Sequence, residues 1–237
     1  MSTASATQRI DAAPRSALHI TGSSAAVAAR KYAVELIGTF FLVFTVGTAS
    51  MISGALAPVA IGSVLMVMVY AGGHISGGHF NPAVTVAVLV RGRISPLNAV
   101  GYWVAQFAAG VLAALLVLWV VGAGRPAALP ESGHLLAASF VVELMFTFAL
   151  AYVVLNVATS RDHPTNSFYG LAIGFTLLVA AITIGGISGA AINPGVTLGG
   201  AVMGMFAWST FWWYLLAQVV GGIVAGLAFR ALNPADK

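Results

Sequence analysis

The chain has 237 residues, of which 59% are hydrophobic and 7% are charged, against about 25% charged residues in an ordinary soluble domain. A chain this apolar belongs in a membrane, and its apolar runs leave no room for a soluble catalytic domain. It contains no cysteine, which excludes disulfides, thiolate metal sites and thiol redox chemistry. Its net charge of +4 is better explained by membrane orientation than by nucleic-acid binding.

Residues 1–30 are rich in Ser, Ala and Thr and hold no apolar stretch of the length that a signal peptide needs. We expect them to form a disordered cytoplasmic tail. The rest of the chain contains apolar runs of about 20 residues, enough to cross roughly 30 Å of hydrocarbon. These runs predict six spans, at residues 32–53, 58–76, 99–121, 135–157, 167–185 and 209–230, with an external loop at 122–134 and a second cytoplasmic tail at 231–237.

A short motif follows the second span and returns after the fifth. The segment Gly73–Thr85 (GHISGGHFNPAVT) and the segment Gly185–Thr197 (GGISGAAINPGVT) lie 112 positions apart and are identical at 8 of 13 positions. The ten residues 81–90 would form a helix of about 15 Å, half the thickness of the hydrocarbon core. We therefore expect two half-helices, at 81–90 and 193–203, that enter the membrane and end near its midplane.

An Asn-Pro pair begins each expected half-helix. Asparagine is a favoured N-cap, and proline in the first turn loses no hydrogen bond. The positive ends of both helix dipoles then point at the midplane, where they disfavour cations and hydronium. The expected pore centre is Asn81 and Asn193, and the half-helix starts are Pro82, Ala83, Pro194 and Gly195.

The glycine-rich bends before the two Asn residues cannot be regular helix without hiding their carbonyl groups from a channel. Unwound backbone at membrane depth is tolerated where it lines a wet cavity. The bends therefore predict a ladder of carbonyl acceptors from Gly77, Gly78, His79, Gly189, Ala190 and Ala191.

The duplication extends beyond the motif. Glu35 in the first span matches Glu143 in the fourth at an offset of 108, and Gln106 matches Gln218 at an offset of 112. Residues 31–121 and 135–230 therefore form two repeats of three spans each, and an odd number of spans inverts the second repeat in the membrane. Intramembrane acids can serve as proton relays. The symmetric places of Glu35 and Glu143 favour a scaffolding role, in which they accept hydrogen bonds from the loop before each half-helix.

The basic residues indicate orientation. Nine of the ten fall on one side of a six-span protein, which by the positive-inside rule places both termini in the cytoplasm. Arg125, in the loop on the other side, is expected to be solvated, with a position over the outer vestibule as the alternative. The nine are Arg9, Arg15, Arg30, Lys31, Arg91, Arg93, Arg161, Arg230 and Lys237.

Together, the two Asn-Pro motifs, the paired Glu residues, the string Ser-Gly-Gly-His-Phe-Asn-Pro-Ala-Val-Thr and the inverted repeat resemble the major intrinsic protein superfamily of aquaporins and aquaglyceroporins, over about residues 31–230. The resemblance implies an all-α membrane protein with six transmembrane helices and two re-entrant half-helices. It also implies a homotetramer in the lipid of the plasma (inner) membrane, without cofactor or metal, that passes water or small neutral solutes. Asn81 and Asn193 would donate their amides to the permeant. His74 would line the cytoplasmic end of the pore, with a role in fixing the bend as the alternative.

The resemblance places an outer selectivity filter at Ile61, Ala181, Ala190 and Val196. Water-selective relatives typically carry Phe, His, a small residue and Arg at these positions, and glycerol-conducting relatives carry Trp, Gly, Phe and Arg. Here none is aromatic or charged, and Val196 stands where the arginine is usual. Because selectivity follows pore diameter and lining groups, we expect a wider, apolar filter that passes water, glycerol-like polyols, urea and metalloid acids such as arsenite.

Several other functions are compatible with parts of the pattern. A mainly water-selective aquaporin with an atypical filter is the first alternative. A secondary transporter also uses inverted repeats, but the expected centre offers Asn in place of an ionisable group, and nothing in the external loops indicates a junction protein. An enzyme is disfavoured because the sequence shows no nucleophile–base pair, metal-ligand cluster or cofactor fingerprint.

Overall fold

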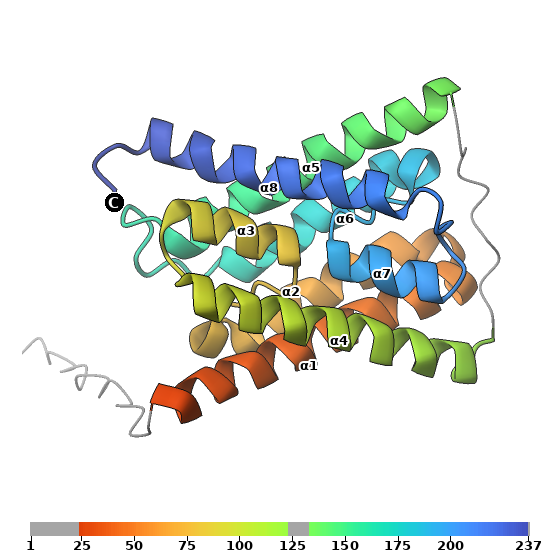
Figure 1. The fold of residues 1–237 in the computed structure, drawn as a ribbon, viewed down its shortest axis with the longest axis horizontal. Helices are drawn as coiled ribbons and strands as arrows, with labels where there is room; N and C mark the ends of the chain where they lie inside the picture. Colours follow the sequence, from red (N-terminus) through yellow and green to blue (C-terminus); the bar gives the residue numbers. More distant parts are fainter. Residues whose placement is uncertain (1–23, 123–132, 237) are drawn as a thin grey trace, which may run out of the picture.

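The computed structural model describes residues 24–122 and 133–236, and it is helical throughout its ordered elements (Figure 1). Within these residues, six helices are long and apolar enough to cross a bilayer. The first half consists of α1 (Ser24–Ile52), the short 3-10 turn η1 (Gly54–Leu56), α2 (Ala57–Ser76), α3 (Pro82–Arg91) and α4 (Pro96–Val120). The second half consists of α5 (Gly133–Thr159), α6 (Tyr169–Ser188), α7 (Pro194–Val202) and α8 (Phe211–Leu232).

The two halves interlock through their short helices. α3 packs against α8 and α7 packs against α4, so each half-helix rests on the last span of the opposite half. Figure 1 shows α3 and α7 end to end in the middle of the bundle, between the long helices. The predicted fold class, six spans with two re-entrant half-helices in an inverted repeat, is confirmed.

Two sides of the bundle need names. α1 begins and α8 ends on the same side, which we call the terminal face (Figure 1). The opposite side, where α4 ends at Val120 and α5 begins at Gly133, we call the connector face. Each long helix runs between these two faces.

Two glycines allow the half-helices to approach the spans. A Cβ atom on Gly110 in α4 would lie 2.6 Å from the carbonyl oxygen of Gly195, and one on Gly222 in α8 would overlap the carbonyl oxygen of Ala83. The two glycines occupy equivalent positions of the two repeats. Each repeat therefore uses a side-chain-free site in its last span to admit the first turn of the other repeat's half-helix.

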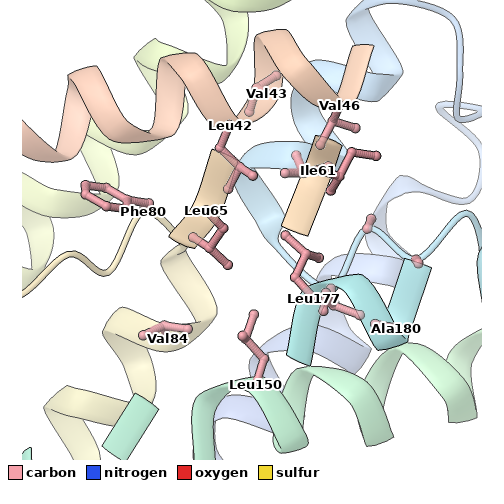
Figure 2. Close-up of a cluster of buried hydrophobic side chains, with 14 of the residues drawn as sticks. Leu42, Val43, Val46, Ile61, Leu65, Phe80, Val84, Leu150, Leu177 and Ala180 are labelled. Atoms are coloured by element: carbon pink, nitrogen blue, oxygen red, sulfur yellow. The ribbon is translucent and has the colours of Figure 1, made fainter. Parts of the chain in front are cut away.

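Apolar side chains lie both at the centre and on the outside of the bundle. Leu42, Leu65, Leu150 and Leu177, from four different long helices, point toward a common central region (Figure 2). On the outer surface, Trp119 is 82% exposed and Leu97 is 80% exposed. Water would be a poor solvent for such a surface, whereas hydrocarbon matches it.

The helix limits differ most from the predicted ones at the start of α1. That helix begins at Ser24, so residues 24–30 of the predicted disordered tail are helical instead, because the run Ser-Ala-Ala-Val-Ala-Ala-Arg favours helix and contains neither Gly nor Pro. The other predicted limits lie within three residues of the observed ones. The rest of the predicted tail and most of the external loop, including Arg125, lie outside the described residues.

Candidate functional site

The two half-helices begin with the same cap. The side-chain Oδ1 of Asn81 accepts hydrogen bonds from the backbone N–H groups of Ala83 (2.8 Å) and Val84 (3.4 Å). Asn193 Oδ1 accepts in the same way from Gly195 (2.8 Å) and Val196 (3.4 Å). The caps fix both asparagine side chains, so that their Nδ2 groups point away from their own helices.

The Nδ2 groups tie the two halves together. Asn81 Nδ2 donates to the carbonyl oxygen of Ile192 (2.9 Å), and Asn193 Nδ2 donates to that of Phe80 (2.9 Å). Each bond runs from one half-helix tip to the loop before the other tip, so the two asparagines meet at the centre of the bundle. A carboxamide NH₂ carries two N–H donors, and these bonds use one from each residue.

A buried carboxylate organises the loop before α3. Glu35 Oε1 accepts from Ser76 Oγ (2.7 Å) and the His79 N–H (2.9 Å), while Oε2 accepts from the Phe80 N–H (2.7 Å) and Gln106 Nε2 (2.8 Å). The side chain has no exposed surface. Glu35 thus holds four segments, α1, the end of α2, the loop and α4, in one network.

Glu143 repeats this network in the second half. Its Oε1 accepts from Ser188 Oγ (2.7 Å) and the Ala191 N–H (3.0 Å), and its Oε2 accepts from the Ile192 N–H (2.7 Å) and Gln218 Nε2 (2.9 Å). The four hydrogen bonds that Glu143 accepts therefore match, one by one, the four that Glu35 accepts. The arrangement leaves the two carboxylates engaged with loop backbone and with amide and hydroxyl side chains.

The same loops contain strained backbone conformations. Phe80 (φ 48°), Ala190 (φ 50°) and Ile192 (φ 36°) adopt left-handed geometry although none is glycine. Each such residue costs of order 1–3 kcal/mol. The N–H groups of Phe80 and Ile192 are bound by Glu35 and Glu143, which offsets that strain.

A cavity passes both asparagines, and side chains from α1, α2, α5 and α6 supply its mostly apolar wall. Among the described residues that border the cavity, His79 is the one with a titratable side chain. Its Nδ1 lies 3.0 Å from Thr85 Oγ1. All four expected filter residues border this cavity: Ile61, Ala181, Ala190 and Val196. So do four of the expected carbonyl residues: His79, Gly189, Ala190 and Ala191.

This central cavity continues toward both faces. It shares His79 and Val154 with a second cavity at the terminal face, which Gly77 also borders. At the connector face it meets a wide vestibule that Ile61 and Ala181 also border. Three cavities that share bordering residues therefore follow one another from the terminal face, past the asparagine pair, to the connector face. Gly78 is not among the residues that border the central or terminal-face cavity.

His74 lies at the terminal face and is exposed. It borders a separate pocket together with His163 and Asn166, and it does not border the central cavity. That pocket shares Gly77 with the terminal-face cavity. His74 thus lies beside the terminal-face cavity, about one helical turn before the bend at Gly77.

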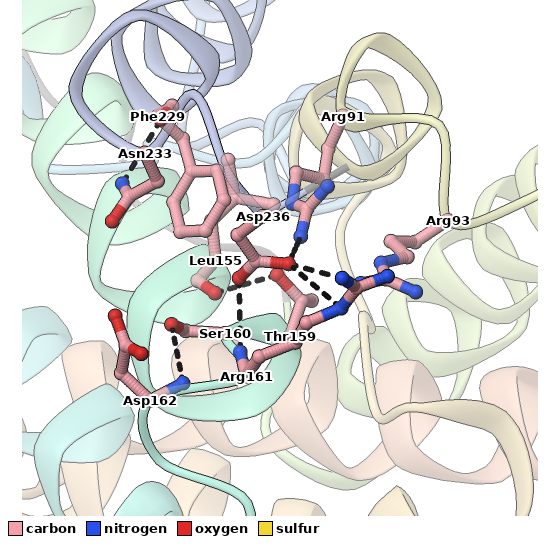
Figure 3. A network of polar contacts seen from close by, with 10 residues as sticks. All are labelled: Arg91, Arg93, Leu155, Thr159, Ser160, Arg161, Asp162, Phe229, Asn233 and Asp236. Atoms are coloured by element: carbon pink, nitrogen blue, oxygen red, sulfur yellow. Dashed lines mark hydrogen bonds and ion pairs between the residues drawn. The ribbon is translucent and has the colours of Figure 1, made fainter.

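An ionic cluster near the same entrance had no counterpart in the sequence analysis. Asp236 accepts from Arg91 Nη2 (2.6 Å), Arg93 Nη2 (3.1 Å) and the Arg161 N–H (2.9 Å), as Figure 3 shows. The Arg161 N–H bond, together with the neighbouring Arg91 guanidinium, lowers the pKa of the Asp236 carboxyl below its ordinary value. Arg93 and Arg161 border the terminal-face cavity, so the chain segment after α8 is attached at the rim of the passage.

Comparison with known proteins identifies the family of this chain. Residues 23–229 match the major intrinsic protein family. The chain belongs to that family. It is 41% identical to "Glycerol uptake facilitator protein-like 6" of Lactiplantibacillus plantarum, over 87% of this chain and 100% of that one, and 38% identical to "Nodulin-26" of Glycine max, over 88% of this chain and 79% of that one. The crystal structure of the aquaglyceroporin from Plasmodium falciparum superposes with a TM-score of 0.72 at 21% identity, covering 88% of this chain and 98% of that one, and this likeness supports the fold.

Family membership decides the general function of this chain. Proteins of the major intrinsic protein family are passive channels and not enzymes, so this member is a multi-pass membrane channel for small solutes. In this channel the asparagine pair lies between the two helix tips and borders a central cavity whose wall is mostly apolar.

Proposed function

We propose that the protein conducts small uncharged solutes, namely water, glycerol-like polyols, urea and metalloid acids such as arsenite. The observation that carries this proposal is the asparagine pair, which offers hydrogen-bond donors within a cavity whose remaining wall is mostly apolar. Such a wall suits solutes that carry hydroxyl or amide groups and no charge. Similarity to a protein named as a glycerol uptake facilitator supports polyols as one class.

Asn81 and Asn193 act as the donors in this proposal. Each has one N–H that is not bonded to the opposite loop, and each borders the cavity. The carbonyl groups of Gly77, His79, Gly189, Ala190 and Ala191 serve as acceptors along the path, and Gly78, with a φ of 63°, permits the bend. A solute that exchanges water for this set of donors and acceptors crosses without a large desolvation penalty.

Ions are excluded by two features of the same centre. Both half-helices direct their positive N-terminal ends at the asparagine pair. The side chains of the apolar filter, Ile61, Ala181, Ala190 and Val196, offer no polar group to replace the water around an ion. Without an arginine at Val196, exclusion rests on these two features alone.

We also propose that the terminal face is cytoplasmic and that the protein is a homotetramer in the plasma membrane. Arg91, Arg93, Arg161 and Arg230 lie at the ends or connections of helices on the terminal face, which supports this orientation. The exposed apolar surface supports contact with lipid and with neighbouring subunits.

The proposal is tested with purified protein in liposomes. Stopped-flow light scattering measures permeability to water, glycerol, urea and arsenite, for wild type and for Val196→Arg. Arginine at this position narrows the filter and adds a charge, so glycerol and urea permeability should fall at least about threefold while water is affected less. Val196→Met, of similar length without charge, separates the two effects.

The alternatives give different results in the same assay. A wild-type channel that passes water but refuses glycerol and urea is a water-selective aquaporin. Saturating flux with a high activation energy indicates a transporter. Equal permeability of wild type and Val196→Arg to every solute contradicts the proposed filter.

A further inference from the structure

Six residues border both the central cavity and the vestibule of the connector face, and they therefore stand at the passage between the two. They are Ser50, Ile61, Ala181, Gly189, Met205 and Phe206. Ile61 and Ala181 belong to the expected filter, on α2 and α6. Met205 and Phe206 come from the turn after α7, which the sequence analysis did not connect with the passage.

The Phe206 ring is held in place by close packing. Its side chain is 5% exposed and lies 5.4 Å from the Tyr214 ring, centroid to centroid. On the other side it covers Gly200 in α7, where any Cβ atom would overlap the ring. Phe206 is therefore a fixed wall of the passage, supported by both α7 and α8.

The backbone of the turn is fixed as well. Gly204 adopts a φ of 75°, and the Met205 N–H donates to the carbonyl oxygen of Gly200 (2.7 Å). This bond closes the end of α7 and directs the chain back across the connector-face mouth. The positions of Met205 and Phe206 thus follow from the way in which the half-helix ends.

The first repeat builds the same turn at the other end of the passage. Gly92 has a φ of 82°, and the Arg93 N–H donates to the carbonyl oxygen of Val88 (3.0 Å), at an offset of 112 from the Met205 bond. Arg93 borders the terminal-face cavity. In both halves, the residue after this glycine therefore lies at a mouth. Arg93 places a guanidinium at the terminal face, and Met205 places a thioether at the connector face.

We infer that Phe206, together with Met205, sets the size limit for solutes at the connector-face mouth. The four filter positions carry no aromatic side chain, and Phe206 supplies an aromatic wall from a different segment. The mouth is consequently narrower than Ile61, Ala181, Ala190 and Val196 alone would make it, and slim linear solutes pass more readily than bulkier ones. This inference rests on the proposed function, because it concerns which neutral solutes the channel admits.

The test compares permeability ratios in proteoliposomes. Phe206→Ala should raise the erythritol-to-water ratio at least about twofold, since pore diameter controls the passage of larger solutes. Met205→Ala should raise it less, and Phe206→Trp should lower it. Trp208→Ala is the matched control, because Trp208 is an exposed aromatic two residues further on that borders neither cavity, and it should leave the ratio unchanged.

A purely structural role for Phe206 would lower all permeabilities together and leave their ratio as in wild type, and that outcome overturns the inference. If Phe206→Ala does not yield folded protein, the test uses Phe206→Leu and Met205→Ala. An erythritol-to-water ratio equal to that of wild type in both variants also overturns the inference. An equal change in Trp208→Ala also counts against it. Wild type that conducts no neutral solute overturns the proposed function and the inference with it, whereas conduction with unchanged ratios in the variants overturns the inference alone.

Discussion

Glu35 shows how one side chain shapes the centre of the molecule. Its carboxylate accepts four hydrogen bonds, from Ser76, the backbone of His79 and Phe80, and Gln106. In Glu35→Gln a single carbonyl oxygen remains, and the new NH₂ faces donors. Buried donors left unsatisfied cost about 1–3 kcal/mol each, so we expect a lower midpoint of thermal unfolding in detergent and reduced solute flux.

Symmetry supplies the comparison for this prediction. Glu143→Gln removes the equivalent acceptors and should reduce the unfolding midpoint by a similar amount. Thr183→Ala is the control, because the Thr183 hydroxyl donates within its own helix on an exposed surface. Unfolding midpoints of both glutamate variants that match wild type would show that the loops hold their conformation without the carboxylates.

At the scale of helices, the contact between α8 and α3 depends on the absence of a side chain. A Cβ atom in Gly222→Ala meets the backbone carbonyl of Ala83, which cannot rotate away as a flexible side chain would. We expect α3 to shift, which lowers both the unfolding midpoint and the water permeability measured by stopped flow. In Gly186→Ala the added methyl group meets nothing within 4 Å, so the higher helix propensity of alanine should leave stability unchanged or raise it. If both variants behave alike, close packing at Gly222 does not position the half-helix.

The sequence alone predicted those parts of the candidate site in which both repeats carry the same residues. The two Asn-Pro caps and the two glutamates are identical residues at matched positions, so symmetry alone indicated that they act together at the centre. The turn after each half-helix is duplicated in backbone but not in side chains, since Arg93 and Ile94 stand opposite Met205 and Phe206. No local pattern marks such a turn as part of a passage, because its place at a mouth follows from how the half-helix packs. The early start of α1 was missed because its first turns are Ala-rich and polar, without the apolar run that reveals a span.

At the scale of the whole molecule, Asp236 joins three segments at the terminal face: the end of α3, the turn after it and the connection between α5 and α6 (Figure 3). The residues that contribute are Arg91, Arg93 and Arg161. Arg91 in turn lies over the Phe229 ring of α8, with 4.5 Å between the guanidinium carbon and the ring centroid. One carboxylate therefore links both repeats at the rim of the passage.

The protonation of Asp236 determines when this link is present. Its pKa in the folded protein is lowered, so the link contributes to stability at every pH above the unfolded value of about 3.9 and is lost as the pH falls through the folded value. The three arginines stay charged throughout this range. Between pH 5 and 8, roughly, we therefore expect constant protection of residues 230–236 in hydrogen–deuterium exchange of the wild type.

Asp236→Asn should reproduce the acid state at neutral pH. Loss of the carboxylate leaves Arg93 and Arg161 without its charge at the terminal-face cavity, so residues 230–236 should exchange faster at pH 7 than in wild type. Asp162→Asn is the matched control, because Asp162 is an exposed acid in the connection between α5 and α6, next to Arg161. Equal protection of residues 230–236 in wild type and Asp236→Asn would mean that helix packing, and not the ionic cluster, attaches the segment after α8.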